Sequence, residues 1–428
     1  MALSTQPYKG ARDFYPEDKR IQKFMFGKLR QTAESFGYQE YDAPIIELTD
    51  LYLSKSSDEI VSEQTYSFTD RGKRNVTIRP EMTPTVSRMV AGRRQELSYP
   101  LRWYSIPNLW RYERPQAGRL REHWQLNVDL FGLAGIEADH EIISVADAIL
   151  QSFGAKRDMY EIRINSRQLI NSILVDFIGE TADQVESAIR LIDHKAKMPH
   201  EDFLGALAKI VTGGKEQELA KLLSAKKFDD LPHQYATHPS VGVLLQLKSL
   251  LKEGGIDNVV DDLSLMRGFD YYTDIVFEVF DKHPDNNRSL FGGGRYDGLV
   301  GMFGVAPVAT VGFGMGDVTL QRFLELHNLL PELKPETDAA VILVGDIYRT
   351  ALAPINELRS KGVNLAVDAS GRKLDAQLRS AIKAKVPFVI FIGEDELKKQ
   401  KYKVRNLSSG EEMVLSLAQT AETLLARH

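Results

Sequence analysis

Cysteine is absent from the 428-residue chain, and its absence excludes several chemistries. Without thiols the protein has no disulfide, no thiolate zinc site and no cysteine nucleophile, so any bound metal must take oxygen or histidine ligands. The same absence fits a reducing compartment.

Long apolar runs and an excess of positive charge are missing as well. Nowhere do eighteen apolar residues follow one another, and the start, MALSTQPYKGARDFYPEDKR, lacks the apolar core of a signal peptide. These absences predict a cytoplasmic protein without a membrane segment. The net charge of −5 argues against indiscriminate nucleic-acid binding, although a local basic surface on an acidic protein can still bind RNA.

The remaining composition is that of a multidomain globular protein. Hydrophobic residues make up 43% of the chain and charged residues 26%, and at this length two or three domains are expected.

The first part of the chain reads as an α+β domain. Apolar residues recur at helical spacing over 18–37, and YQEYDAPIIEL then reads as a strand interrupted by Pro44. A helix is predicted over TPTVSRMVAGRRQ, between hairpin segments at 64–70, 75–79, 101–113 and 122–131. This pattern predicts an antiparallel sheet.

The pattern of predicted secondary structure changes twice further along the chain. Leu-, Ala- and Ile-rich helical stretches fill about 166–249, after which RGFDYYTDIVFEVF and VATVGFGMG return to strand type. We therefore expect a discontinuous domain formed by 1–165 and 250–330, with a helical insertion between its parts. After LPELKPETD, strand and helix patterns alternate over 336–428, which predicts a small α/β domain with parallel strands.

The segment WRYERPQAGRLREHWQLNVDLFG, residues 110–132, concentrates polar groups on one hairpin. Because alternate side chains of a strand share a face, Arg111 and Glu113 are expected to point one way. On the returning strand one face is predicted to carry Gln125, Asn127 and Asp129, and the other Trp124, Leu126, Val128 and Leu130. A simply solvated polar face is the alternative. Arg119 and Arg121 lie on the connecting loop, and arginines suit bidentate grips on phosphate.

RYERPQAGRLREHWQ resembles motif 2 of class II aminoacyl-tRNA synthetases, specifically the histidyl-tRNA synthetase family. Other segments are similar to that family in the same order: YKGARDFYPED, the motif 1 strand FGYQEYDAPIIEL, TIRPEMTPTVSR, LMRGFDYYTD and FGGGRYDGLV. The resemblance covers most of the chain and is weakest in the helical insertion. It implies a class II antiparallel catalytic domain and a C-terminal anticodon-binding domain.

The resemblance also implies an activity and its residues. The family activates L-histidine with ATP and Mg²⁺, then transfers it to tRNA(His). The implied histidine-binding residues are Glu81, Thr83, Arg111, Gln125, Asp129, Arg267, Tyr271 and Tyr272. Arg111 and Arg267 are the implied catalytic pair at the α-phosphate. Asp129 stands where many bacterial members of the family have Glu.

The implied ATP-binding residues are Arg111, Glu113, Arg119, Arg121 and Arg322. Glu113 would lie near the adenine, and Arg119 and Arg121 near the β- and γ-phosphates. By the same resemblance Arg114 and Gln116 would approach the tRNA acceptor end, and Arg372 and Lys373 of the last domain could contact tRNA phosphates. Motif 1 implies a homodimer.

One segment departs from the family pattern. In VGFGMGDVTLQRFL, Val318 and Thr319 occupy the places of the Glu-Arg pair of motif 3, whose Arg contacts ATP. Arg322 lies one helical turn beyond Thr319 and could replace it, or could be an ordinary surface arginine. Because noncatalytic relatives also keep this fold, the regulatory subunit of ATP phosphoribosyltransferase is the alternative reading. A tRNA-binding module without aminoacylation is a third.

Overall fold

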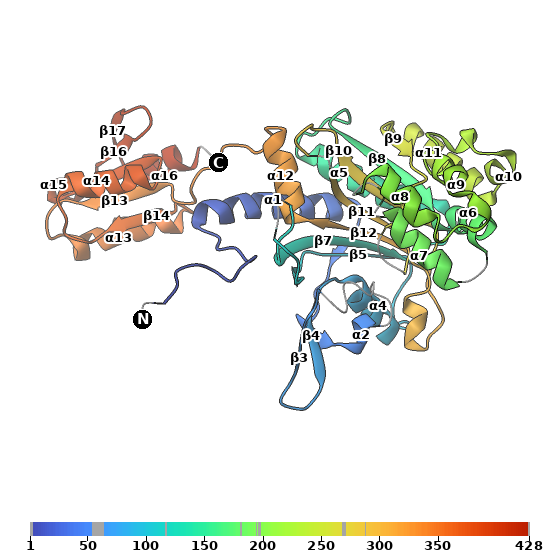
Figure 1. Ribbon diagram of the computed structural model, residues 1–428. Helices are drawn as coiled ribbons and strands as arrows, with labels where there is room; N and C mark the ends of the chain where they lie inside the picture. The colour runs from blue at the N-terminus through green and yellow to red at the C-terminus, as the bar shows by residue number, and fades with distance from the viewer. Residues whose placement is uncertain are drawn as a thin grey trace. The chain divides into compact units, whose positions relative to one another are not determined.

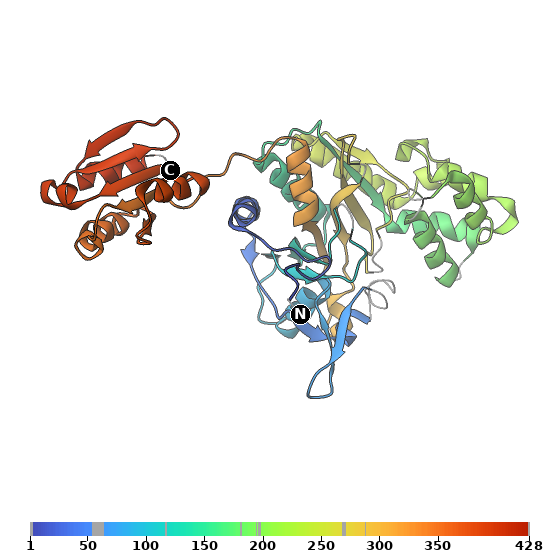
Figure 2. The same cartoon turned by 60° about the vertical axis from the view of Figure 1, so that its left-hand side comes forward.

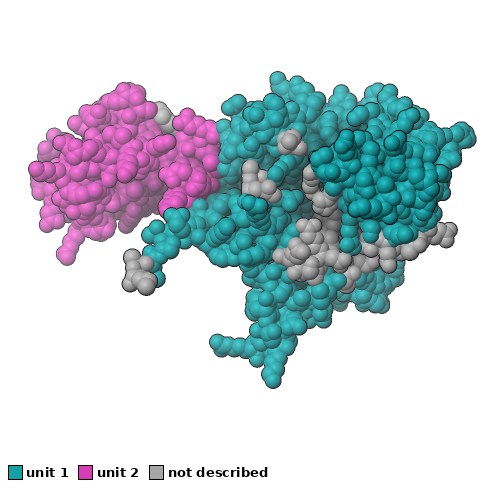
Figure 3. Space-filling model, viewed as in Figure 1, with its two compact units in different colours: residues 1–14, 22–330 teal, residues 15–21, 331–428 magenta. Residues whose placement is uncertain are grey.

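The computed structural model describes residues 3–53, 64–115, 118–179, 182–193, 195, 198–267, 271–286 and 288–426. The chain folds into two compact units (Figure 3). The first comprises Met1–Phe14 and Gln22–Leu330, and the second Tyr15–Ile21 and Pro331–His428. The helical insertion belongs to the first unit, and the boundaries expected for it at 166 and 249 stay predictions. Within the described part of the chain, no helix combines the length and apolarity needed to span a bilayer.

A large mixed sheet organises the first unit (Figure 1). Its strands follow the order β1 (Gln39–Glu40), β5 (Leu101–Ser105), β7 (Glu122–Phe131), β12 (Thr310–Gly316), β11 (Ser289–Arg295), β10 (Ile275–Asp281), β8 (Tyr160–Ser166) and β9 (Val259–Asp261). The short β6 (Asn108–Trp110) pairs with β7. All neighbours are antiparallel except β1 with β5 and β8 with β9, so the expected antiparallel α+β domain is confirmed.

The two faces of β7 differ in chemistry as the alternation predicted. Leu126, Val128 and Leu130 are at most 1% exposed, and α5 (Ile136–Ser152) and α12 (Asp317–Leu326) contact the sheet. On the opposite face Asn127 is 4% exposed and Asp129 is 3% exposed. The polar face of this strand is therefore buried, and the alternative of a simply solvated face is wrong.

An ion pair joins the sheet to α5. Arg295, at the end of β11, contacts the carboxylate of Asp139 and donates a hydrogen bond to the Gly135 carbonyl at 3.0 Å. Their side chains are 7% and 2% exposed. A buried charge is tolerated only when it is paired, so this contact fixes α5 on the sheet.

A second, smaller sheet contains β2 (Ile46–Leu48), β4 (Asn75–Ile78) and β3 (Tyr66–Thr69), beside α2 (Asp50–Leu53) and α4 (Thr83–Gly92). One of its faces is polar: Thr77 is fully buried and its hydroxyl bonds those of Ser67 and Thr49. From the same face Glu47 pairs with Arg88 of α4 at 2.7 Å. The apolar side chains of β2 and β3 therefore lie on the face opposite this polar one.

The motif 2 hairpin is less regular than expected. The strand predicted over 101–113 breaks after Ser105 and β6 ends at Trp110, so Arg111 and Glu113 do not alternate along a strand. The amide of Tyr112 instead donates to the Gln64 carbonyl, and the amides of Arg121 and Glu122 donate to the Gly10 carbonyl. Segments distant in sequence thus take the backbone bonds that a regular hairpin would make internally.

The other helices of the first unit begin close to where the sequence places them. The N-terminal helix α1 (Pro16–Ser35) buries Met25, Phe26, Leu29 and Ala33. The insertion contains α6 (Arg167–Ile178), α7 (Ala182–Asp193), α8 (His200–Leu207), α9 (Glu216–Leu222), α10 (His233–Ala236) and α11 (Pro239–Glu253). Ser166 caps α6 through the Leu169 amide. Figures 1 and 2 show these helices gathered at one end of the large sheet, beside β8.

The second unit is an α/β domain. Strands β14 (Leu365–Asp368), β13 (Ala339–Leu343) and β15 (Phe388–Ile392) are parallel, whereas β16 (Tyr402–Asn406) and β17 (Glu412–Leu415) continue the sheet antiparallel. The expected α/β domain with parallel strands is confirmed for β14, β13 and β15. The connection from β15 to β16 is too short for a crossover that would bring the chain back to the start of β15, so β16 runs antiparallel. The helices are α13 (Tyr348–Ser360), α14 (Leu374–Lys383), α15 (Glu394–Lys399) and α16 (Leu417–Leu425).

Asp139→Ala should destabilise the first unit strongly, because it removes the buried counter-ion of the Arg295 guanidinium and leaves it paired, among the described residues, only with the exposed carboxylate of Asp297 at 3.7 Å. We expect urea denaturation to show a loss of about 3–5 kcal/mol. Glu96→Ala is the control, since Glu96 pairs with Arg93 on the surface and its loss should cost under about 1 kcal/mol. Equal effects of the two changes would contradict the role given to Asp139.

Candidate active site

Glycines form the floor of the polar face of the large sheet. They are Gly292 and Gly294 of β11 and Gly312 and Gly314 of β12. A Cβ built on Gly292 would lie 2.8 Å from the side chain of Arg267, and one on Gly294 would lie 2.9 Å from that of Tyr272. A Cβ on Gly312 would lie 2.5 Å from the side chain of Asp129, and one on Gly314 would lie 2.8 Å from that of Gln125. These four side chains thus lie against bare backbone on one face.

Asp129 is the most strongly perturbed carboxylate of this face. Burial raises its pKa to about 7, although the hydroxyls of Tyr296 and Tyr41 act in the opposite direction. The Tyr296 hydroxyl donates a hydrogen bond to Oδ1, whereas the buried Oδ2 accepts none of good geometry from the described residues. Oδ2 therefore keeps acceptor capacity within a buried site.

Tyr296 was not among the predicted site residues. It lies in FGGGRYDGLV, the segment singled out in the sequence, but only the register that sets Tyr296 beside Asp129 gives it a role.

Glu81 and Tyr271 meet beside this pocket. The Tyr271 hydroxyl donates to Oε2 of Glu81 at 3.2 Å, and Tyr271 and Glu81 are 7% and 2% exposed. Burial, followed by the charge of Glu81, raises the pKa of Tyr271 well above its ordinary value, so its hydroxyl stays protonated. Thr83 follows as the first residue of α4.

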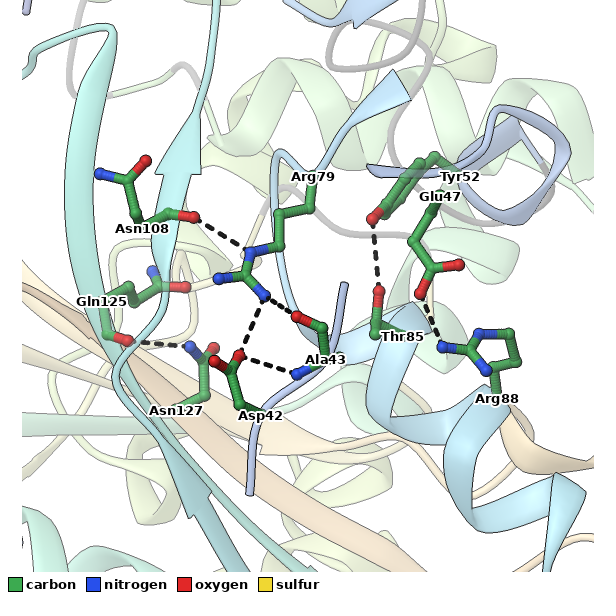
Figure 4. A network of polar contacts seen from close by, with 10 residues as sticks. All are labelled: Asp42, Ala43, Glu47, Tyr52, Arg79, Thr85, Arg88, Asn108, Gln125 and Asn127. Carbon is green, nitrogen blue, oxygen red and sulfur yellow. Dashed lines mark hydrogen bonds and ion pairs between the residues drawn. The ribbon is translucent and has the colours of Figure 1, made fainter. Parts of the chain in front are cut away.

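Arg79 fixes the segment that carries Glu81 (Figure 4). Its guanidinium contacts Asp42 at 3.1 Å and donates to the carbonyls of Ala43 at 2.6 Å and Asn108 at 3.1 Å. The side chain is 6% exposed. Arg79 therefore ties the motif 1 segment and β6 together immediately before Pro80 and Glu81.

Arg111 and Arg267 border one connected group of residues. Arg111 Nε donates to the Pro80 carbonyl at 2.9 Å, next to Glu81. Glu81 accepts from Tyr271, whose ring centroid lies 4.9 Å from that of Tyr272. The Arg267 guanidinium lies 5.9 Å from the Tyr272 ring. The two arginines, far apart in sequence, thus lie at the ends of one contiguous set of contacts.

His123 is another residue that the sequence did not single out, although it alternates with Gln125 and Asp129. Burial, together with the nearby charges of Arg111 and Arg12, lowers its pKa to about 3. Its imidazole is therefore neutral at pH 7 and offers an uncharged aromatic face. The two-residue alternation along β7 could have placed His123 on the same face as Gln125 and Asp129 from the sequence alone.

Arg119 and Arg121, the two predicted phosphate-binding residues of the motif 2 loop, differ in exposure and in partners. Arg119 is exposed and lies 3.6 Å from the carboxylate of Glu113. Arg121 is only 9% exposed: it donates to the Tyr8 hydroxyl at 2.9 Å, and its guanidinium lies 3.8 Å from the Tyr112 ring centroid.

The two residues predicted to approach tRNA, Arg114 and Gln116, also belong to this loop. Arg114 is exposed, and Gln116 falls outside the described residues.

The motif 3 position faces this loop. Thr319 lies 3.7 Å from where a Gly118 Cβ would be, and its hydroxyl bonds the carbonyls of Leu290 and Gly316. Arg322, one turn later, is directed to the Asp285 carbonyl at 3.1 Å. Among the described residues, Thr319 therefore lies beside the motif 2 loop, whereas Arg322 contacts Asp285.

In the second unit Arg372 is half-exposed and pairs with Asp368 at 2.8 Å, and Lys373 precedes α14. Part of the positive charge expected there is thus neutralised within the domain.

Family models match nearly the whole chain. One describing histidyl-tRNA synthetase matches residues 10–317, and one describing an anticodon binding domain matches residues 338–427. The chain belongs to the histidyl-tRNA synthetase family. The class II fold and the C-terminal anticodon-binding domain expected from the sequence are confirmed.

Two curated relatives carry the name histidine–tRNA ligase. That of Leptospira biflexa serovar Patoc is 39% identical over 428 residues, covering 99% of this chain and 98% of the relative. That of Thermoplasma volcanium is 38% identical, covering 97% of each.

Solved structures show the same architecture. Apo histidyl-tRNA synthetase of S. aureus is 27% identical with a TM-score of 0.73, covering 98% of this chain and 100% of its own. The synthetase of Nostoc sp. PCC 7120 is similar at a TM-score of 0.82 over the full length of both chains, and at 22% identity this likeness concerns the fold alone.

Asp129→Asn should stabilise the empty protein in a pH-dependent way. The pKa of Asp129 is raised from its ordinary value of 3.8 to about 7 in the folded state, so wild-type stability falls as pH rises from about 4 through 7. Asparagine carries no charge, so we expect Tm to match the wild type near pH 4 and exceed it by a few degrees at pH 8.

Asp368→Asn is the control of opposite sign. Hydrogen bonding from Ser370 lowers the pKa of Asp368, so asparagine there should lose stability at pH 8 relative to pH 3. A pH-independent Tm difference for Asp129→Asn would show that this carboxyl is not perturbed.

Proposed function

We propose that this protein is a histidine–tRNA ligase, which activates L-histidine with ATP to histidyl-adenylate and transfers the histidyl group to tRNA(His). The observation that carries the proposal is the buried Asp129 carboxyl, which has a vacant oxygen beside Tyr296 and lies on the same glycine floor as Arg267. Membership of the family and the curated relatives support it.

The histidine side chain would be recognised at Asp129. An imidazole N–H donating to the vacant Oδ2 would satisfy a buried acceptor that another amino acid would leave unpaired, with Tyr272 on the same floor. Glu81, Thr83 and Gln125 would receive the α-amino group, and Arg111 and Arg267 would face the carboxylate. Selectivity would then come from unpaired polar groups when a different side chain enters.

Activation brings the histidine carboxylate to the α-phosphorus of ATP, so two anions must meet. The carboxylate oxygen forms a bond to phosphorus while the bond to pyrophosphate breaks, and no covalent bond to the protein is needed. Fixed guanidiniums of Arg111 and Arg267 would stabilise the charge that develops there. Arg119 and Arg121 would contact the β- and γ-phosphates, with Glu113 near the adenine.

Mg²⁺ would enter with the nucleotide. Among the described residues, no group of three or more His, Asp or Glu side chains is arranged to hold a metal ion. Mg²⁺ is commonly bound by substrate phosphates with one or two carboxylates. The ion would neutralise part of the triphosphate charge.

tRNA would contact both units. Arg114 and Gln116 are proposed at the acceptor end, and Arg372 and Lys373 at the phosphates near the anticodon. A role as regulatory subunit of ATP phosphoribosyltransferase is less well supported, because the site keeps both arginines and both tyrosines and a C-terminal anticodon-binding domain is present.

A histidine-dependent exchange of pyrophosphate into ATP tests the proposed activity. The wild type should catalyse the exchange, and Arg267→Ala should lower its kcat by about 10²–10³-fold because one preorganised charge is lost. Arg322→Ala should stay within about threefold, since Arg322 bonds the Asp285 carbonyl. Absence of exchange in the wild type would reject the proposed function.

A tenfold or greater loss in Arg322→Ala would have a different meaning. It would return Arg322 to the ATP site as the replacement for the motif 3 arginine, as the spacing from Thr319 first suggested.

We further propose that the protein is a homodimer joined through its small sheet. Leu48, Val76 and Phe68 form one register row across the sheet, on the face opposite the polar one. Leu48 is 55% exposed and Phe68 is 48% exposed, with Ile46 beside them at 44%. An apolar sheet face that is exposed while its polar face is buried suits a second copy of the chain.

Leu48→Asp should weaken this dimer, because it places a charge in the apolar row. Sedimentation velocity should give a dimer mass for the wild type and a monomer mass for the variant at micromolar concentration. Ile382→Asp is the matched control, since Ile382 of α14 is 54% exposed and lies in the second unit. A monomeric wild type would refute the homodimer.

A further inference from the structure

Arg267 has an unusual backbone for a long side chain. Its φ is +60°, in the left-handed region that residues other than glycine rarely adopt. Such conformations persist where the surroundings hold them, and they cluster at functional sites. A long arginine side chain also loses rotamer entropy when it is held in one orientation, so a fixed guanidinium needs partners.

Two partners on neighbouring strands hold the guanidinium. Nη1 contacts Oε1 of Glu278 at 3.0 Å, and Nη2 donates to the Gly292 carbonyl at 3.1 Å. Glu278 of β10 and Gly292 of β11 are directly opposite each other in the register, so both contacts come from one rung of the ladder. The missing side chain at Gly292 leaves the space that the guanidinium occupies.

These contacts leave Nε of Arg267 without a partner among the described residues, and the Tyr272 hydroxyl lies within hydrogen-bonding reach of the guanidinium. The side chain of Arg267 is 15% exposed, and Nε is buried. A guanidinium has five N–H groups in a rigid plane, so fixing two of them fixes the direction of the rest. The plane of the guanidinium is then set before any ligand arrives.

We propose that Glu278 is a positioning residue for histidine activation, whose carboxylate fixes the plane of the Arg267 guanidinium toward the charge that develops at phosphorus. The proposal rests on the proposed function above. Glu278 itself touches no substrate. Its contribution is preorganisation: an arginine that is already oriented needs no rearrangement when the transition state forms.

Glu278 lies at the edge of a cleft and not in the apolar core. Its side chain is 19% exposed and lines a cleft of about 390 Å³, together with Lys195 and His200 of the insertion. Its register neighbour on β8, Arg163, is paired with other carboxylates. Glutamine at 278 therefore keeps the size and one acceptor while removing the charge.

Glu278→Gln should lower kcat of the exchange by about 10–100-fold while leaving KM for histidine and ATP within about threefold. An interaction that matters only in the transition state changes kcat and not ground-state binding. Tm should stay within about 3 °C of the wild type. Glu161→Gln is the matched control, because Glu161 pairs with Arg163 at 2.6 Å on the same sheet and should retain wild-type kcat.

The decisive measurement is a double-mutant cycle. If Glu278 acts through Arg267, then adding Glu278→Gln to Arg267→Ala should change kcat by less than about twofold. Independent, multiplicative losses would overturn the proposal, as would wild-type kcat in Glu278→Gln.

A second variant covers the case in which glutamine destabilises the fold. Glu278→Asp keeps the charge but shortens its reach by one methylene, so it should lower kcat with little change in Tm, and wild-type kcat there would also overturn the role. Absence of exchange in the wild type would instead reject the proposed function on which the role rests.

Discussion

The close approach of side chains to bare backbone is the constraint on which the site depends. Gly292, Gly294, Gly312 and Gly314 lie on one face of two neighbouring strands, and a Cβ on any of them would come within 3 Å of a polar side chain of the site. Glycine lowers strand stability, so its repetition here marks a place where space outweighs packing. The hydrophobic face beneath, packed against α5 and α12, supplies the rigidity that these glycines do not.

Burial then gives the polar groups their chemistry. Removal from water raises the pKa of Asp129 to about 7 and lowers that of His123 to about 3, so an acid and a base on the same face of β7 both favour their neutral forms. The guanidiniums of the arginines are charged in any case, and carbonyl and carboxylate oxygens fix their positions. The site thus combines neutral groups suited to hydrogen bonding with fixed positive charges suited to phosphate.

Much of this could be read from the sequence because the signals are local. The alternation along β7 predicted that Gln125, Asn127 and Asp129 share a face, and helical spacing predicted α1 and the insertion helices. The predictions were wrong where distant segments intervene. Gly10 and Gln64 take the backbone bonds of the motif 2 hairpin, and no local pattern shows that effect.

The sequence by itself determined the family, the α+β class and the residue types of the site, because these follow from motif order and from the period of apolar residues. Only the tertiary structure decided that Tyr296 bonds Asp129, that Glu278 holds Arg267 and that Arg322 turns to Asp285. For Tyr296 and Asp129 the physical reason is register, because the strands that bring them together are distant in the chain and a shift of one residue would move every side chain to the other face. For Arg267 and Arg322 it is the path of the backbone that carries each arginine, which no local pattern specifies.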